Sequence, residues 1–154
     1  MAWLDLVALA TVADVGPLTG VNRALVRQGL AIMGQRGNPG ITALADISRL
    51  ENKPEAWHLG FMLGPRVNAG GRVGEAGLGV QLLTTTDTDA ATGIAMRLDQ
   101  YNTERREIES AVLDAAMALA EQQASEDSPL ILVASEGWHP GVIGIVAGRI
   151  KEAY

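Results

Sequence analysis

The chain has 154 residues, no cysteine and a formal net charge of −6 at pH 7. The length suits one domain with a hydrophobic core, and the lack of cysteine excludes a disulfide scaffold, a thiolate metal site and a cysteine nucleophile. The acidic balance argues against a protein that coats nucleic acid by bulk charge, but not against a local basic site. No apolar stretch reaches the roughly 18 residues of a membrane-spanning helix, and Asp5 interrupts the first apolar run, which is unlike a signal peptide.

Breaking and capping residues divide the first part of the chain into four predicted helices, over residues 4–13, 23–33, 39–50 and 54–63. Asn22 is interpreted as the N-cap of the second helix. Asn38 and Pro39 are interpreted as the N-cap and first position of the third. Asp14, at the end of the first helix, is either a ligand for a hard cation or an ordinary cap or turn aspartate.

The stretch from Gly64 to Gly79 is rich in glycine and is interpreted as a loop, compatible with a short helix over residues 75–84. It carries Arg66, Asn68 and Arg72. A guanidinium group offers a planar fork of donors that fits phosphate oxygens, and glycine lets a backbone approach an anion closely. The stretch is therefore either a phosphate cradle or a flexible loop with solvated arginines. No G-x-x-x-x-G-K-[ST] motif occurs in the chain, which disfavours a nucleotide triphosphatase.

One long helix is predicted over about residues 88–124, roughly 55 Å long at 1.5 Å per residue. The prediction rests on apolar or small residues spaced alternately by three and four, at Ala91, Ile94, Leu98, Tyr101, Ile108, Val112, Ala115 and Leu119. The length favours a strut between two bodies, with a coiled-coil dimer helix as the alternative. Arg105 falls in the same seam and argues against a plain dimer core, because an unpaired charge there is costly.

The last part of the chain predicts a β-loop-α unit. Residues 130–134 (LILVA) are typical of a strand buried on both faces, and residues 141–154 are typical of a helix. His139 and Gly141 lie where the loop meets the helix, whose N-terminus favours anions. This segment is either an anion site or a purely structural turn.

Four stretches together resemble the RecJ family of bacterial 5′-to-3′ single-stranded-DNA exonucleases, in the DHH phosphoesterase superfamily. They follow the family's order and spacing over nearly the whole chain: LDLVALATVADVGPLTGVNRALVRQGL, GFMLGPRVNAGGRVGEAGLGVQLLTT, LDQYNTERREIE and EGWHPGVIGIVAGRI. The resemblance implies an α/β parent protein of which this chain is an internal, mostly α-helical fragment. Residues 1–86 would be the C-terminal part of the DHH catalytic domain, residues 87–124 the long connecting helix, and residues 125–154 the start of the DHH-associated domain, with its first β-α unit.

The resemblance also implies a site. Asp14 matches the family's last acidic motif, in TVAD, and would bind or orient the catalytic Mn²⁺ or Mg²⁺. Other residues match the motifs P-R-[IVL]-N-A-[AG]-x-R-[LV]-G and G-W-H-P-G and would contact DNA or its phosphates: Arg72 first, Arg66 second, then Asn68, His139 and Gly141.

The chain departs from the family in ways that bear on activity. It has no Asp-His-His triplet, none of the other upstream aspartate motifs and no G-G-H segment. Because one carboxylate cannot hold a two-metal site, we expect the isolated chain to be inactive. The expected parent is a monomeric cytoplasmic enzyme of DNA repair and recombination, which acts on single-stranded DNA, involves no membrane and works beside other repair proteins. Two alternatives stay open: a DHH-family phosphodiesterase of cyclic dinucleotides or short RNA, and a non-catalytic helical interaction module.

Overall fold

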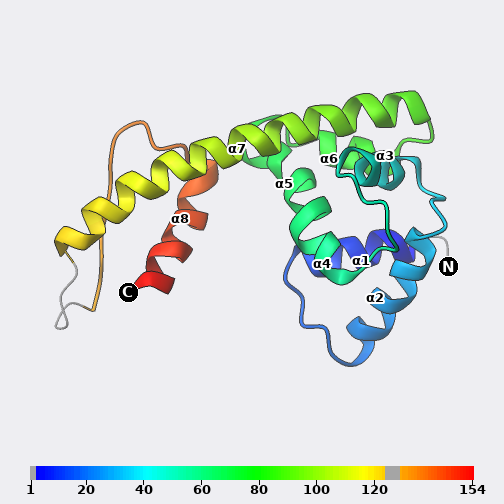
Figure 1. Ribbon diagram of the computed structural model, residues 1–154, viewed down its shortest axis with the longest axis horizontal. Helices are drawn as coiled ribbons and strands as arrows, with labels where there is room; N and C mark the ends of the chain where they lie inside the picture. Colours follow the sequence, from blue (N-terminus) through cyan, green and yellow to red (C-terminus); the bar gives the residue numbers. More distant parts are fainter. Residues whose placement is uncertain (1–2, 124–128) are drawn as a thin grey trace. The chain divides into compact units, whose positions relative to one another are not determined.

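The computed structural model describes residues 3–123 and 129–154, and within these ranges the chain is mostly α-helical and has no β-strand (Figure 1). The chain divides into two compact units, one ending at Asn102 and the other beginning at Thr103. The predicted helical character is confirmed. None of the helices in the described ranges has the length and apolar character that a bilayer crossing requires.

The first unit is a bundle of short helices with one hydrophobic core. Its elements are α1 (Leu4–Ala13), α2 (Gly20–Met33), α3 (Pro39–Ile47), α4 (Ala56–His58), the π-helical turn η1 (Leu59–Leu63), α5 (Gly64–Val73), α6 (Leu78–Thr84) and the first part of α7 (Thr88–Gln123). Five leucines are completely buried in this core: Leu44, Leu59, Leu63, Leu82 and Leu98. Burying each contributes roughly 1.5–3 kcal/mol, so the core holds α3, η1, α6 and the first part of α7 together.

The predicted second helix starts earlier than expected. Thr19 is the N-cap of α2, which begins at Gly20, so the interpretation of Asn22 as an N-cap is wrong. Asn22 lies inside the first turn, and its side-chain amide donates to the carbonyl oxygen of Pro17 (3.1 Å). The interpretation of Asn38 is confirmed, because its side chain accepts from the Ile41 N–H (3.0 Å) and Pro39 takes the first position of α3.

The interpretation of the glycine-rich stretch as a loop is also wrong for its first part. Residues 64–73 form helix α5, which continues from α4 and η1. Each interior glycine disfavours a helix by about 1 kcal/mol, but two of these glycines allow close packing. A Cβ atom at Gly64 would lie 3.0 Å from the Ala13 Cβ, and one at Gly70 would lie 3.1 Å from the Leu98 Cδ2. The glycines therefore serve contacts with α1 and α7 rather than flexibility.

The second unit contains the rest of α7 and α8 (Pro140–Ala153). Its core joins two rows of residues spaced by four, Val112, Ala116 and Ala120 on α7 and Val142, Val146 and Ile150 on α8. The predicted seam is therefore wrong by one position here, because Ala116 and Ala120 are buried in place of Ala115 and Leu119. A four-residue row packs against a neighbouring helix of the same chain, whereas a heptad assumes a coiled-coil partner. Arg105 pairs with Glu109 one turn away, so its charge is compensated.

Residues 130–134, predicted to form a strand, have no regular secondary structure. A strand is stabilised by pairing with another strand, and the described ranges contain none to pair with. The Leu132 N–H instead donates to the Gln123 side-chain oxygen (3.2 Å). The helix predicted after this segment is confirmed as α8.

The packing of α2 on α1 yields a first prediction, because a Cβ atom at Gly29 would lie 2.1 Å from the Leu4 carbonyl oxygen. We expect Gly29→Ala to lower the free energy of unfolding by about 1–3 kcal/mol, since one helix must move away from the other. A Cβ atom at Gly93 of α7 would meet nothing within 4 Å, so Gly93→Ala should raise the stability by about 0.5–1 kcal/mol. Urea unfolding followed by circular dichroism measures both, and equal effects at the two positions would contradict this packing.

Candidate functional site

A cavity of about 620 Å³ in the first unit lies between the end of α1 and α5. Most of its lining is apolar, but four polar residues face it: Thr11, Asp14, Asn22 and Asn68. The fold thus brings Asp14 and Asn68, which are far apart in the sequence, to the same cavity. Such a concave site with a few convergent polar groups is where ligands bind in proteins.

Asp14 follows the last residue of α1 as its C-cap, and its side chain is exposed. The chain then turns sharply: the Val15 N–H donates to the Val12 carbonyl (3.1 Å) and the Gly16 N–H to the Thr11 carbonyl (2.8 Å). This pair of bonds is a Schellman motif. It uses backbone groups alone, and no hydrogen bond or ion pair within the described ranges engages the Asp14 carboxylate. The carboxylate is therefore available to a cation at the edge of the cavity.

The rotation of α5 sends the two candidate arginines in different directions. Asn68 and Arg72 are one turn apart, about 40° around the helix axis, and both are exposed. Arg66 lies about 200° from Asn68 around the same axis. The Arg66 Nε donates to Asp99 Oδ1 of α7 (2.7 Å), and its Nη1 donates to the Met62 carbonyl of η1 (2.7 Å). Arg66 is thus fixed with its Nη2 group left over, whereas Arg72 shares the face of α5 that carries Asn68.

The end of α5, which carries Arg72, is held by α7. A Cβ atom at Gly74 would lie 2.4 Å from the Tyr101 ring, so glycine lets the helix end rest on this ring. The Tyr101 hydroxyl accepts from the Arg97 Nε (3.2 Å), and Arg97 forms an ion pair with Glu75 (2.6 Å). The hydrogen bond to Tyr101 and the charge of Glu75 raise the pKa of Arg97. The Arg97 guanidinium therefore stays charged at all relevant pH values.

In the second unit, His139 and Gly141 contact each other. His139 is the N-cap of α8, and its Nδ1 accepts from the Gly141 N–H (3.0 Å). An imidazole that accepts through Nδ1 is neutral and carries its proton on Nε2. The ring therefore caps the helix and also keeps one N–H donor for a ligand.

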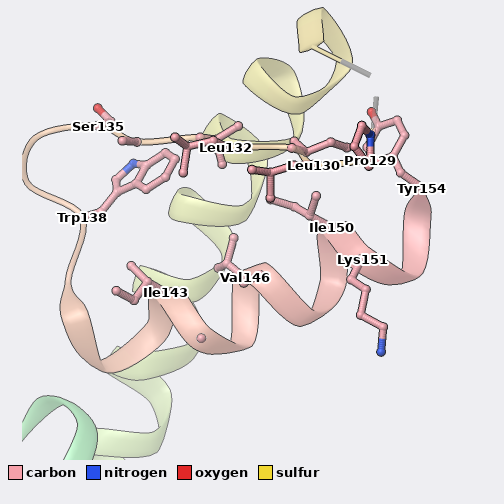
Figure 2. A pocket seen from close by; sticks show the side chains of 15 residues that line it. Pro129, Leu130, Leu132, Ser135, Trp138, Ile143, Val146, Ile150, Lys151 and Tyr154 are labelled. Atoms are coloured by element: carbon pink, nitrogen blue, oxygen red, sulfur yellow. The ribbon is translucent and has the colours of Figure 1, made fainter. Parts of the chain in front are cut away.

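The second unit also holds a larger open cavity, of about 1330 Å³, between residues 129–135 and α8. Figure 2 shows Val146 and Ile150 pointing from α8 toward this extended segment. Its lining is mostly apolar, the exceptions being Ser135, Lys151, the Tyr154 hydroxyl and the Trp138 N–H, and it includes none of the predicted site residues. It offers no set of groups for acid–base or metal chemistry, so the smaller cavity is the candidate site.

The residues at the smaller cavity fit part of a metal site. Carboxylate, amide and hydroxyl oxygens are the hard ligands that Mg²⁺ and Mn²⁺ prefer, and Asp14, Asn22, Asn68 and Thr11 supply them. Within residues 3–123 and 129–154, however, no group of three or more His, Asp or Glu side chains is arranged to hold a metal ion. The cavity could therefore contribute one carboxylate, that of Asp14, to such a site.

Sequence reasoning missed two participants, Asn22 and Asp99. Asn22 was assigned to helix capping, and the pairing of Asp99 with Arg66 joins residues too distant in the chain for local spacing to indicate. The sequence could have predicted that Arg66 and Arg72 point in different directions, since a helix over residues 64–73 places them on different faces. The glycine content concealed that helix.

No known family profile matches the chain as a whole or in part. Individual relatives do match the chain. The single-stranded-DNA-specific exonuclease RecJ of Dickeya dadantii is 46% identical to it, and that of Escherichia coli K12 is 42% identical. Each alignment runs over 156 residues and covers 98% of this chain and 27% of the relative. A crystal structure of RecJ with Mn²⁺ from Thermus thermophilus superposes with a TM-score of 0.87 at 38% identity, over 99% of this chain and 22% of that one. The chain thus spans about a quarter of the length of the relatives it matches.

These relatives are all nucleases that act on single-stranded DNA, and the likeness extends over almost every residue of this chain in both sequence and structure. The class of protein that this chain resembles in fold and sequence is therefore that of the single-stranded-DNA-specific exonucleases. The chain belongs to the RecJ family.

The contacts of Arg66 lead to a second prediction. We expect Arg66→Ala to lower the free energy of unfolding by about 1–2 kcal/mol, because it removes a part-buried ion pair and a carbonyl bond. Arg27→Ala, which removes the same charge from an exposed position of α2, should cost at most about 0.5 kcal/mol. Urea unfolding of both variants measures this, and equal losses would mean that the Asp99 contact does not hold Arg66.

Proposed function

We propose that this chain is part of a 5′-to-3′ exonuclease that hydrolyses the phosphodiester bonds of single-stranded DNA with Mn²⁺ or Mg²⁺, in DNA repair and recombination. The observation that carries the proposal is the likeness to RecJ over nearly all of the chain. The cavity that joins Asp14 to Asn68 supports it, because it places a carboxylate beside the helix face that bears Arg72.

The proposed layout follows the resemblance. Residues 1–86 contribute the end of the DHH catalytic domain, residues 87–124 the connecting helix, and residues 125–154 the beginning of the DHH-associated domain. The full enzyme is proposed to be a monomeric cytoplasmic protein that acts on single-stranded DNA and works beside repair and recombination proteins.

Each candidate residue has a proposed role that follows from its position. Asp14 binds or orients the metal, which when bound lowers the pKa of a water ligand and balances the charge that builds up on the phosphate. Arg72 is the principal phosphate contact, and Asn68 assists it from one turn earlier on α5. Arg66 is a secondary contact, through the Nη2 group that its bonds to Asp99 and Met62 leave over.

His139 and Gly141 are proposed to contact the strand from the second unit. The Nε2–H of His139 is a donor suited to a phosphate oxygen, while its Nδ1 is occupied by the Gly141 N–H. The helix end that His139 caps also favours negative charge. The apolar face of α7 in the second unit, with Val112, Ala116 and Ala120, packs within the chain against α8, which favours the nuclease over a coiled-coil module.

Binding of single-stranded DNA to the chain tests the role of Arg72. At low salt, Arg72→Ala should weaken binding of a fluorescent oligothymidine and reduce the slope of log K against log salt by about 0.7, as expected when a single strand loses one phosphate contact. Arg27→Ala, which removes the same charge from the exposed side of α2, should leave the slope unchanged. A similar effect of the two substitutions would show that only bulk charge matters.

Activity tests the role of Asp14. The isolated chain should show no metal-dependent hydrolysis of single-stranded DNA, because it supplies a single carboxylate. A chimera in which this chain replaces the matching segment of the Thermus thermophilus RecJ should degrade single-stranded DNA with Mn²⁺. Asp14→Asn in that chimera should lower the rate by roughly 100-fold or more, since even outer partners of metal ligands matter by 10–100-fold. An active isolated chain, or a chimera indifferent to Asp14→Asn, would refute the assignment.

A further inference from the structure

The turn that follows Asp14 adopts an unfavourable backbone conformation. Val15 has φ 56°, in the left-handed region, which costs most residues about 1–2 kcal/mol and is rarest for β-branched ones. Glycine normally occupies this place in a Schellman motif. The Val15 side chain is 87% exposed, so packing of this side chain does not compensate. Another interaction must hold the turn in place.

The neighbouring residue leaves the turn little freedom. A Cβ atom at Gly16 would lie 2.9 Å from the Thr11 carbonyl oxygen, the atom to which the Gly16 N–H donates (2.8 Å). If Val15 relaxes to a negative φ, this bond must break, and the Asp14 carboxylate changes direction with the backbone. The Gly16 bond therefore reports whether the turn is in place.

Besides the two backbone bonds of the turn, the side chain of Asn22 bonds to the residue that follows it. From the first turn of α2, its Nδ2 donates to the Pro17 carbonyl (3.1 Å), directly after the strained turn. Only the NH₂ group of an amide can donate to a carbonyl, so this bond also fixes the orientation of the side chain. Asn22 lines the same cavity as Asp14. The amide thus ties the segment after Asp14 to α2, which packs closely on α1.

We propose that Asn22 is a positioning residue for the Asp14 carboxylate. Through Pro17 it holds the Val15–Gly16 turn in its left-handed conformation, and the turn holds Asp14 at the edge of the cavity. The inference rests on the proposed role of Asp14 as a metal ligand. It adds a residue that lines the same cavity and acts on Asp14 through the backbone of the turn.

Amide hydrogen exchange in the metal-free chain tests the first half of this proposal. Asn22→Ala should make the Gly16 amide exchange about five- to tenfold faster, the size expected when one ordinary hydrogen bond is lost. Adding Val15→Gly should return exchange to near the original rate, because glycine adopts the left-handed conformation without strain. Gln28→Ala, at an exposed position of the same helix, is the matched control and should change nothing. A general stabilising role of Asn22 in α2 would not be rescued by Val15→Gly.

Binding of Mn²⁺ tests the second half. Paramagnetic broadening of the amide resonances of residues 14–16 gives the half-saturating Mn²⁺ concentration. Asn22→Ala should raise it by about three- to tenfold, and the double variant with Val15→Gly should recover most of the loss. Asp14→Asn should abolish the broadening.

The outcomes separate the two claims. Broadening that survives Asp14→Asn refutes the metal role of Asp14 itself. If Asp14→Asn abolishes broadening while Asn22→Ala leaves both exchange and Mn²⁺ binding within twofold of the original, the metal role stands and the role of Asn22 is refuted. Loss at Asn22→Ala that Val15→Gly fails to restore refutes the proposed action through the turn.

Discussion

Close approach of the α5 backbone to its neighbours determines where the candidate residues of this helix, Arg66, Asn68 and Arg72, lie. Figure 1 shows α5 and its neighbours α1 and α7. Glycine at position 64 lets the start of the helix contact α1, and glycine at position 74 lets its end rest on the ring of Tyr101. A helix held at both ends cannot rotate. Its rotation in turn fixes which side chains face the cavity at the end of α1 and which face α7.

The rotation of α5 gives Arg66 and Arg72 different surroundings. Arg66 faces Asp99 and is held by bonds on two of its nitrogens, so it links α5 to α7 and keeps little freedom. Arg72 lies on the face of Asn68, which lines the cavity with Asp14. The strained turn at Val15 then sets the direction of the carboxylate. Charge placement in this acidic chain is thus local, and the net charge of −6 does not describe the surface that a strand of DNA would meet.

Local signals in the sequence predicted much of this arrangement. The caps at Asn38, the length of α7 and the helix after His139 follow from spacing and capping alone. The glycine-rich helix α5 could not be predicted from propensity, because its stability comes from tertiary contacts that only the fold reveals. The segment 130–134 has the composition of a strand, but the described residues contain no strand for it to pair with. In the second unit, Ala116 and Ala120 are buried in place of the predicted heptad residues Ala115 and Leu119, because α7 packs against α8 there. Asp14 and Asn68 were candidates from their place in the sequence, and the resemblance favoured their functional interpretation, whereas their meeting in one cavity needed the fold.

The central claim is that one face of α5, with Asn68 and Arg72, meets single-stranded DNA beside Asp14. Chemical-shift mapping of the ¹⁵N-labelled chain with a short oligothymidine tests it most directly. The account predicts the largest changes at the Asn68 side-chain amide, the Arg72 Nε–H and the backbone of residues 14–16, with smaller changes at the Arg66 Nε–H. Changes confined to residues 129–154, or centred on Arg66 and Asp99 while Asn68 and Arg72 stay unaffected, would contradict it.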